Sequence, residues 1–348
     1  MQDILTCAMG LDIHRDVIVA CLAKGELGTD PEIEIRSFST LIPEMRKLRD
    51  WVLEAECHHV AMESTGIYWQ PIYEMLEPCF DGQISILVVN ARHMKNVPGR
   101  KTDMRDAQWI ATLLRAGLLK GSFIPDKTFR ELRHLTRYRK SIVRDITAQK
   151  NRIDKFLQSS GFRFTAFLSD AFGASGRNII RHLMEYGSIS REALDRCLKT
   201  QTRKRIDEIL IALNGSLSEH QRGFLRMIFG HLEALEQHRH TVEDAITEEI
   251  TKHEEALRLL CSIPGIDVTA AAAIIAEIGT DMSAFPDSQH ICSWAGLSPG
   301  NNESAGKRKS AHINKGNPYL KSMLCEVGWV ISGKRSLYLS GWYWRIKQ

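Results

Sequence analysis

Apolar and polar residues follow two different rhythms along the first third of the chain. Short apolar runs, some with strict alternation of apolar and charged residues, are typical of β-strands. Longer segments with apolar residues every three or four positions are typical of amphipathic helices. Strands are expected at residues 7–13, 16–23, 32–38, 59–63 and 84–90, and helices at residues 41–56, 67–79 and 103–119.

The order of these elements is three strands, then helix, strand, helix, strand and helix, which predicts an α/β domain over residues 1–125. This is the order of a ribonuclease-H-like domain, although several topologies share it. Helical spacing predicts that two sets of side chains face the core. These are Met45, Leu48, Val52 and Leu53 in the first helix, and Trp109, Ile110, Leu113 and Leu114 in the last.

Strand patterns disappear over residues 126–258, where long helices are expected. Six apolar residues recur at intervals of three, four and seven with basic residues between them: Leu132, Leu135, Ile142, Ile146, Ile153 and Phe156. A second long helix is expected over residues 232–260, and residues 231–258 are acidic, with 8 Asp and Glu against 3 Lys and Arg. Two amphipathic helices of opposite charge indicate a coiled-coil hairpin or a dimer arm. Ser190, Ser218 and Gly215 are interpreted as caps and breaks of shorter helices between them.

From residue 259 the composition changes again, and a mainly helical third domain is expected over residues 259–348. A Pro-Gly turn at residues 263–266 precedes an Ala-rich helix over residues 269–278. This arrangement fits a helix-hairpin-helix, whose turn and helix N-terminus contact a DNA phosphate, and it fits a plain helix start equally well. Beyond Trp294 follows a Gly-, Ser- and Asn-rich loop that is too polar and too basic to enter a core.

The overall composition narrows the class of protein. The 348 residues are 43% hydrophobic and 25% charged, which is ordinary for a globular protein of two or three domains. No apolar stretch approaches the roughly 20 residues that cross a bilayer, and residues 1–10 lack the pattern of a signal peptide. The 8 cysteines are scattered without a C-x-x-C pair. We therefore expect no membrane span, no disulfide scaffold and no zinc ribbon, but a reducing, cytoplasmic location.

Charge is distributed unevenly along the chain. The net charge is +4, but residues 91–155 hold 17 Lys and Arg against 6 Asp and Glu, which leaves the rest of the chain at −7. This polarisation favours a polyanionic partner, most simply a nucleic acid. The alternative is a solvated basic helix that pairs with an acidic one.

Four acidic residues occupy positions that a metal-dependent nuclease of this fold would use. Asp12 ends the first strand and Glu63 ends the fourth, while Asp103 and Asp106 lie three apart on one face at a helix start. Neighbouring carboxylates need a cation to neutralise them, and oxygen ligands favour Mg²⁺ or Mn²⁺. Taken singly, each has an ordinary explanation as a turn former, a surface carboxylate or a helix cap. Together, in this strand order, they favour a site that holds two such ions.

A serine in the polar loop near the C-terminus is a candidate nucleophile. Ser304 is followed by three cations at residues 307–309. A free alcohol is a weak nucleophile that needs a base or a metal, and serine in such loops is usually a turn residue. A nucleotide-binding P-loop is excluded, because five residues separate Gly300 from Gly306 and Arg308 replaces the required Ser or Thr.

Two segments resemble a known family. Residues 62–69, MESTGIYW, and residues 89–107, VNARHMKNVPGRKTDMRDA, closely resemble the DEDD transposases of the insertion sequence 110 family, the bridge-RNA-guided recombinases. The turn at residues 263–265, residues 294–299 and the Ser304 loop resemble the second characteristic domain of that family. The long motif around Asp103 is very specific, whereas the middle helices match only in character.

The resemblance implies a chemistry for these residues. Asp12, Glu63, Asp103 and Asp106 fall on the four metal-binding acids of a Holliday-resolvase-like, or RuvC-like, domain that uses Mg²⁺ or Mn²⁺. Ser304 falls on the nucleophilic serine, which forms a covalent phosphoserine link to DNA. This chain departs from the family pattern in having one extra residue before the glycine that follows the serine. The implied activity is RNA-guided cleavage and rejoining of DNA by the transposase of an insertion sequence, in a bacterium or archaeon.

The resemblance also implies partners. Members of the family use a structured noncoding RNA that pairs with donor and target DNA. They act as dimers that assemble into tetramers, in which the serine domain of one subunit completes the acid site of another. We therefore expect residues 126–258 to bind RNA and to dimerise. The basic residues expected to contact nucleic acid are Arg100, Lys101, Arg137, Arg139, Lys140, Arg144, Lys307, Arg308 and Lys309.

Two other classes of function remain open at the level of sequence. The chain fits a junction-resolving or RNA-cleaving nuclease that uses water, with Ser304 as a structural residue. It also fits an inactive nucleic-acid-binding protein, although four acids in register argue against that alternative. A product attached covalently to the protein distinguishes the recombinase from the nuclease.

Overall fold

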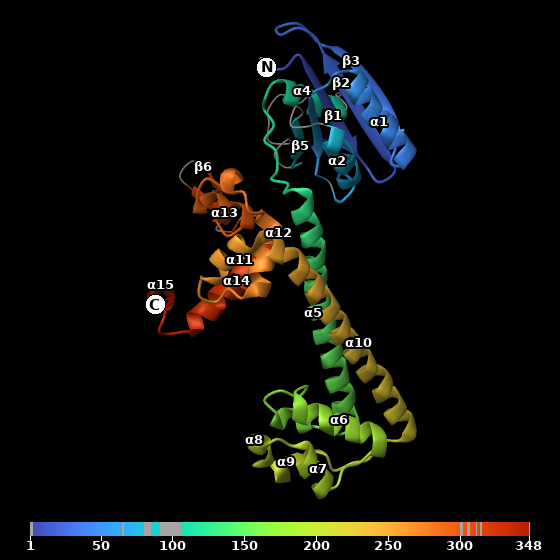
Figure 1. The fold of residues 1–348 in the computed structure, drawn as a ribbon, viewed down its shortest axis with the longest axis vertical. Coiled ribbons are helices and arrows are strands. Elements are labelled where there is room, and N and C mark those ends of the chain that lie inside the picture. Colours follow the sequence, from blue (N-terminus) through green and yellow to red (C-terminus); the bar gives the residue numbers. More distant parts are fainter. Residues whose placement is uncertain are drawn as a thin grey trace. The chain divides into compact units, whose positions relative to one another are not determined.

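The structure is a computed structural model that describes residues 3–64, 66–79, 85–90, 106–299, 302–304, 307–310, 312–313 and 315–347, with the backbone alone at residues 302–304 and 307–310. Contacts divide the chain into two compact units, Met1–Ile124 and Pro125–Gln348 (Figure 1), and each is described by itself. The division of the sequence into three domains stays a prediction.

The first unit is built on a mixed five-stranded sheet. Its strands are β1 (Cys7–Ile13), β2 (Val17–Lys24), β3 (Glu32–Ser39), β4 (His59–Glu63) and β5 (Ser85–Val89), and their order in the sheet is β3-β2-β1-β4-β5. The first three strands are antiparallel neighbours, whereas β4 pairs parallel to β1 and β5 pairs parallel to β4. All five strands predicted from the sequence are confirmed, with small shifts at some ends.

Helices cover both faces of this sheet (Figure 1). In β1, Met9 and Leu11 pack with α1 (Ile42–Glu54) and α2 (Gln70–Leu76), which the 3₁₀ turn η1 (Glu77–Cys79) follows. Ala8, on the opposite face, packs against α4 (Asp106–Arg115). The alternation of side chains along a strand therefore separates the two helical layers.

Three expectations for these helices need correction. The helix expected from residue 67 begins at Gln70, because residues 66–69 form a turn that opens with Gly66 at φ +61°. The expected inward Leu53 is 44% exposed, and Trp51 takes the buried position, where it packs against Phe38. The helix expected over residues 103–119 ends at Arg115, because Gly117 adopts a left-handed φ of +66°. Residues 103–105 lie outside the described residues.

Two long antiparallel helices form the axis of the second unit: α5 (Lys127–Ser159) and α10 (Glu219–Ile250) (Figure 1). All six apolar positions predicted along α5 join the core of this unit. The second helix was expected to start at residue 232, and that expectation is wrong. It starts at Glu219, where Ser218 and Gln221 form a capping box. Coiled-coil geometry and dimerisation stay predictions.

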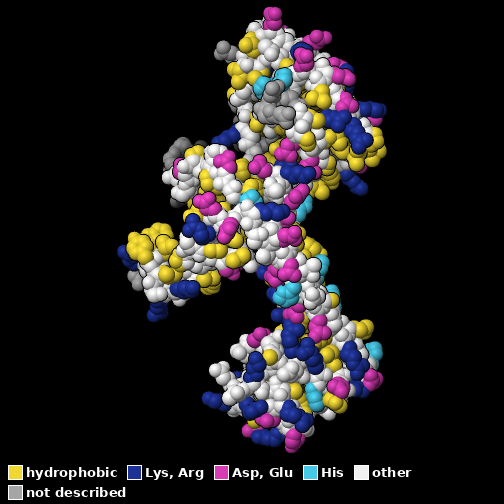
Figure 2. Space-filling model, viewed as in Figure 1, with side chains coloured by type: hydrophobic (Ala, Val, Ile, Leu, Met, Phe, Trp, Pro, Cys, Tyr) yellow, Lys and Arg dark blue, Asp and Glu magenta, His cyan; other side chains and the backbone are white. Residues whose placement is uncertain are grey.

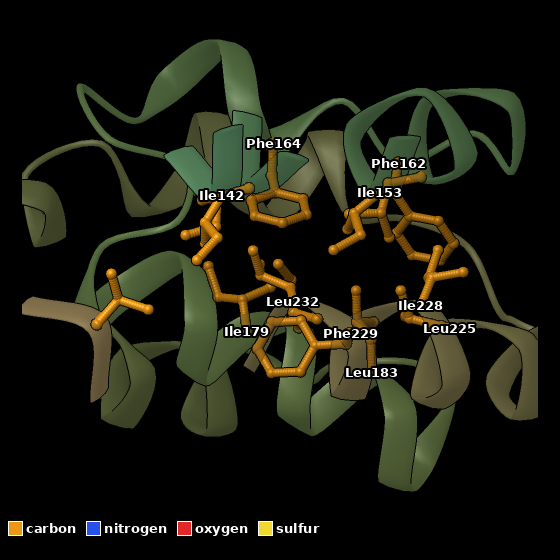
Figure 3. Close-up of a cluster of buried hydrophobic side chains, with 14 of the residues drawn as sticks. Ile142, Ile153, Phe162, Phe164, Ile179, Leu183, Leu225, Ile228, Phe229 and Leu232 are labelled. Atoms are coloured by element: carbon orange, nitrogen blue, oxygen red, sulfur yellow. The ribbon is translucent and has the colours of Figure 1, made fainter. Parts of the chain in front are cut away.

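Short helices close the far end of this hairpin. They are η2 (Phe164–Phe167), α6 (Ala174–Tyr186), α7 (Arg191–Cys197), α8 (Thr200–Arg203) and α9 (Ile206–Ala212). Their apolar side chains meet both long helices in one core, in which Phe162, Phe164, Ile179 and Phe229 are buried (Figure 3). Ser190 caps α7 by accepting a hydrogen bond from the backbone N–H of Ala193, which confirms the cap predicted at that residue.

The C-terminal part of the second unit is mainly helical. Its elements are η3 (Thr251–His253), α11 (Glu254–Cys261), α12 (Val268–Ile278), η4 (Met282–Ala284), α13 (Ser288–Ala295), β6 (Asn302–Ser304), β7 (Lys307–Ser310), α14 (Pro318–Gly333) and α15 (Tyr338–Lys347). The predicted turn lies between α11 and α12, with Gly265 at φ +90° and Asp267 capping α12. The polar stretch expected as a loop instead forms the two-stranded antiparallel sheet β6-β7. Among the described residues, no helix is long and apolar enough to cross a membrane.

Candidate functional site

The register of the first sheet brings two of the predicted acids together. Leu11 of β1 pairs with Met62 of β4 in parallel, so Asp12 and Glu63 occupy the next positions on neighbouring strands. Parallel neighbours in register project to the same side of a sheet. Since Ala8 and Ala61 pack against α4, Asp12 and Glu63, at even spacing from them, lie on the face that α4 covers.

The start of α4 brings the third acid to the same place. Asp106 is the first residue of α4, and its charge acts on Asp12, as does the charge of Glu63. Asp12, Glu63 and Asp106 therefore form one electrostatic group at the carboxyl ends of β1 and β4, and we call this group the acid site. Asp103 lies outside the described residues, so its place at the acid site stays a prediction.

Close packing and one buried ion pair fix α4 on the sheet. A Cβ atom at Gly10 would lie 2.2 Å from the carbonyl oxygen of Ala107, so only glycine lets the helix backbone approach β1 this closely. At the other end of α4, the buried Arg115 pairs with Asp3 at 3.0 Å and donates to the carbonyl oxygen of Leu5 at 3.0 Å. Both contacts hold Asp106 at the ends of the strands.

The pKa of Asp12 reflects the electrostatics of the acid site. Burial raises the pKa of Asp12, whose side chain is 16% exposed, and the charges of Asp106 and Glu63 raise this pKa further. His14 acts in the opposite direction, since its Nε2 atom lies 3.2 Å from Oδ2 of Asp12. An ionised Asp12 is therefore held at a cost in free energy that a bound cation would offset.

The donor chemistry of the acid site fits a divalent cation. Its three described carboxylates offer oxygen donors with net negative charge, which is the set that Mg²⁺ and Mn²⁺ prefer. Over the residues that the structure describes, no three His, Cys, Asp or Glu side chains are gathered closely enough to hold a metal ion as they stand. The role of Asp12, Glu63 and Asp106 as ligands of such an ion therefore stays a prediction.

The raised pKa predicts that the acid site destabilises the metal-free protein. A carboxyl group whose pKa is raised by folding binds its proton more tightly in the folded state, so stability is gained as the pH falls through that pKa and is lost above it. Asp12→Asn removes this loss. We expect it to raise the urea midpoint of unfolding at pH 7 in EDTA and to flatten the acid-side pH dependence of that midpoint. An unchanged or lower midpoint would contradict the electrostatic account.

Ser304 lies in the second unit, on the small sheet. It ends β6 and pairs with Lys307 of β7, while Glu303 pairs with Arg308. The bridge between Pro299 and Ile313 closes the base of this hairpin. Ser304 therefore lies at the end of its strand, with the backbone of the basic strand beside it. The side chains of Ser304, Lys307, Arg308 and Lys309 lie outside the described part of the structure.

The predicted basic residues of α5 fall into two groups. Arg137 forms a two-pronged ion pair with the buried Glu277, at 2.7 Å and 2.8 Å, and Arg139 pairs with Glu243 of α10 at 2.7 Å. The alternative interpretation expected this basic helix to pair with an acidic one, and Arg139 does pair in that way. All four residues line a cavity of about 460 Å³ between α5, α10, α12 and α14, in which Lys140 lies 6.0 Å from the ring centroid of Tyr319 and Arg144 donates to the hydroxyl of Ser141. Arg100 and Lys101 lie outside the described residues.

Glu277 organises the second unit and was not among the residues predicted from the sequence. It is 2% exposed, accepts from Arg137, lies 3.2 Å from Nε of Arg133 and accepts from Nδ2 of Asn317 at 2.6 Å. Glu277 thereby ties α12 to α5 and to the cap of α14. A signal was present in the sequence, since Glu277 is the sole charged residue of the mostly apolar helix α12.

The two groups of basic residues predict different responses to salt. Affinity for RNA should fall as the salt concentration rises, because each phosphate contact releases counterions. Lys140→Gln with Arg144→Gln should reduce the magnitude of the log–log slope by about 1.4. Arg137→Gln with Arg139→Gln is the matched control. It should change the slope less, because both charges are already paired, and should lower the free energy of unfolding. Filter binding across a salt series measures the first effect. Equal slopes in wild type and the Lys140/Arg144 pair would place the RNA elsewhere.

Comparison with known proteins gives matches at both ends of the chain. Residues 9–161 match the family model of DEDD transposases of the IS110 type, and residues 257–342 match a model described as transposase IS116/IS110/IS902 family. The acid site lies in the first match and Ser304 in the second.

Two relatives are similar over much of the chain. One is named "Putative transposase y4qE" from Sinorhizobium fredii (strain NBRC 101917 / NGR234), with 23% identity over 247 residues, 68% of this chain and 51% of the relative. The other is named "Insertion element IS110 uncharacterized 43.6 kDa protein" from Streptomyces coelicolor (strain ATCC BAA-471 / A3(2) / M145). It is 28% identical over 239 residues, 63% of this chain and 58% of the relative. The matches thus span somewhat more than half the length of these curated relatives.

Proposed function

From the premise that the chain belongs to the IS116/IS110/IS902 family of transposases, we propose that it cuts and rejoins donor and target DNA under the guidance of a structured RNA. The observation that carries this proposal is the acid site, where Asp12, Glu63 and Asp106 interact at one edge of the sheet. Such a group of carboxylates serves phosphodiester chemistry when it holds Mg²⁺ or Mn²⁺.

The first unit is proposed to be a ribonuclease-H-like, RuvC-like catalytic domain. Two features support this. The strand order β3-β2-β1-β4-β5 combines three antiparallel strands with two parallel ones, and the acids lie at the ends of β1 and β4 and at the start of α4. The fourth acid of the proposed set is Asp103.

In this proposal Asp12, Glu63, Asp103 and Asp106 would hold a divalent ion at the acid site. That ion, when bound, would polarise the phosphodiester and offset its developing charge. The contact of α4 with Gly10 keeps Asp106 in place. Burial of Asp12 limits the access of water to this carboxylate.

Ser304 is proposed as the nucleophile. Its Oγ atom loses its proton and forms a bond to phosphorus, while the bond between phosphorus and the 3′ oxygen breaks and that oxygen takes up a proton. The products are a phosphoserine joined to the 5′ end of one strand and a free 3′-hydroxyl. Because the phosphoserine conserves the energy of the phosphodiester, a 3′-hydroxyl can reverse the step and rejoin DNA without ATP. Lys307, Arg308 and Lys309 would offset charge on the phosphate.

The proposed assembly is a homodimer that pairs into a tetramer in the cytoplasm. The described acids lie in the unit Met1–Ile124 and Ser304 lies in the unit Pro125–Gln348. Each subunit is proposed to lend its serine to the acid site of another, so that cleavage waits for assembly. The second candidate is a nuclease that uses water at the acid site alone, which needs only residues of the unit Met1–Ile124.

One experiment separates the two candidates. End-labelled target DNA is incubated with the protein, the noncoding RNA transcribed beside its gene, and either Mg²⁺ or EDTA, and the products are denatured. The recombinase gives Mg²⁺-dependent cleavage with label attached to protein. Cleavage without an attached product would support the water-using nuclease, and the absence of Mg²⁺-dependent cleavage would contradict both.

A further inference from the structure

The last two helices carry a surface of exposed aromatic and aliphatic side chains. Trp329 of α14 is 74% exposed, and on α15 Tyr338 is 80%, Trp342 54% and Ile346 65% exposed. We call these four residues the aromatic face. Figure 2 shows hydrophobic side chains gathered over the C-terminal helices, with Lys and Arg side chains at the border. Apolar groups of this size on a surface mark an interaction site.

The inner contacts of α15 explain why its aromatic side stays outside. Ser340 is fully buried and donates its hydroxyl hydrogen to the carbonyl oxygen of Ser332 at 3.0 Å, and Nε1 of Trp344 donates to the same oxygen at 3.1 Å. Ser340 and Trp344 thus attach α15 to the carbonyl oxygen of Ser332 in α14. Tyr338, Trp342 and Ile346, spaced four apart, follow the opposite stripe.

The charge around the aromatic face indicates what covers it. Residues 327–348 contain four Lys and Arg and no Asp or Glu. All four cations, Lys334, Arg335, Arg345 and Lys347, are exposed. A second copy docked on the same face would place like charges together, whereas an anionic partner is attracted. Exposed rings among cations are the features that bind unpaired nucleotides, because bases stack on the rings while phosphates meet the cations.

We propose that the aromatic face binds single-stranded DNA. Tyr338 and Trp342 offer stacking surfaces about 6 Å apart along the helix, the rise of four residues. Helical spacing places Arg345 beside this stripe, where it would meet the phosphates of the same strand. The proposal rests on the proposed function, since a transposase that exchanges strands exposes unpaired DNA, and it places a binding surface outside the acid site, the serine hairpin and the basic residues of α5.

Matched double substitutions test the stacking rings. Tyr338→Leu with Trp342→Leu keeps apolar bulk and removes the rings, whereas Tyr338→Phe with Trp342→Phe keeps them. Affinity for a fluorescent 12-nucleotide oligo-dT is measured by anisotropy. The leucine pair should bind about tenfold more weakly for each ring lost, and the phenylalanine pair within about threefold of wild type. Tyr186→Leu, at a ring 61% exposed on α6, should leave the affinity unchanged.

The contrary results are distinct from one another. Equal affinity of the leucine and phenylalanine pairs would overturn the proposal, and so would tighter binding of oligo-rU or of duplex DNA than of oligo-dT. A wild-type protein whose sedimentation shows self-association that the leucine pair abolishes, without ring-dependent binding of oligo-dT, would assign the face to a second copy. Binding to anionic phospholipid vesicles in place of oligo-dT would assign it to a membrane surface.

Failure of this inference is separable from failure of the proposed function. Mg²⁺-dependent DNA cleavage by the wild-type protein tests the function, and oligo-dT binding in EDTA tests the aromatic face. If the protein cleaves DNA but its affinity for oligo-dT does not depend on the rings, the inference about the aromatic face is wrong and the proposed function stands. If binding depends on the rings but no cleavage occurs, the proposed function is wrong and the aromatic face remains a binding surface. Arg345→Gln adds a charge readout, a reduction of about 0.7 in the magnitude of the log–log salt slope.

Discussion

We expect Asp12→Asn, Glu63→Gln, Asp103→Asn and Asp106→Asn each to lower Mg²⁺-dependent DNA cleavage by about a thousandfold and to leave RNA binding within about twofold of wild type. The expected loss follows from the shared charge of the acid site, in which Asp12 already responds to Asp106 and Glu63. A metal ion contributes several kcal/mol to the stability of the transition state, and several kcal/mol correspond to factors of about a thousand in rate. The basic surface of the second unit is untouched by these changes.

A matched control separates loss of the metal from loss of charge in general. Asp16→Asn removes a carboxylate that follows β1 closely but is 87% exposed, and it should cleave as wild type does. Asp12→Asn adds an internal check, because the same substitution is expected to stabilise the metal-free fold. Loss of cleavage together with a higher urea midpoint excludes unfolding as the cause. Full Mg²⁺-dependent activity in any of the four variants would remove that residue from the metal site.

The sequence predicted the first sheet well because its strands are buried apolar runs between polar turns. β1 and β4 match the expected residues 7–13 and 59–63 at both ends. Since strand ends were placed correctly, Asp12 and Glu63 were also placed at strand ends. That these two ends are neighbours follows from the parallel pairing of β1 and β4, which the structure adds.

Contacts between distant elements escaped the same reasoning. Arg139 was predicted to contact nucleic acid, but its guanidinium group forms an ion pair with Glu243 of α10 at 2.7 Å. This pair depends on the register of the two long helices. The start of α10 was placed 13 residues late, because exposed Phe224 and Met227 blur the apolar stripe of its first turns. The contact of Gly10 with α4 could not be predicted either, since a glycine inside a strand does not reveal which helix approaches it.

Ser304→Ala is expected to abolish the covalent protein–DNA adduct while leaving RNA and DNA binding intact. Without Oγ no phosphoserine forms, so no free 3′-hydroxyl is generated by this route. The pairing of Ser304 with Lys307 at the end of β6 gives the residue a fixed backbone position beside the basic strand. End-labelled DNA incubated with protein, RNA and Mg²⁺ and then denatured should show a slowly migrating adduct with wild type and none with Ser304→Ala.

Neighbouring serines make the assignment of the nucleophile specific. Ser310→Ala changes β7 opposite Asn302 of β6, and Ser298→Ala changes the segment before the hairpin, so both perturb the same region without removing Oγ of Ser304. Both variants should form the adduct as wild type does. An adduct that survives Ser304→Ala and disappears in one of these two variants would move the nucleophile to that serine.

A mixture of Ser304→Ala and Asp12→Asn protomers should recover cleavage at sites where an intact serine meets an intact acid site in trans. Recovery is expected only if those two groups come from different subunits, so a mixture without adduct would place both groups in one subunit.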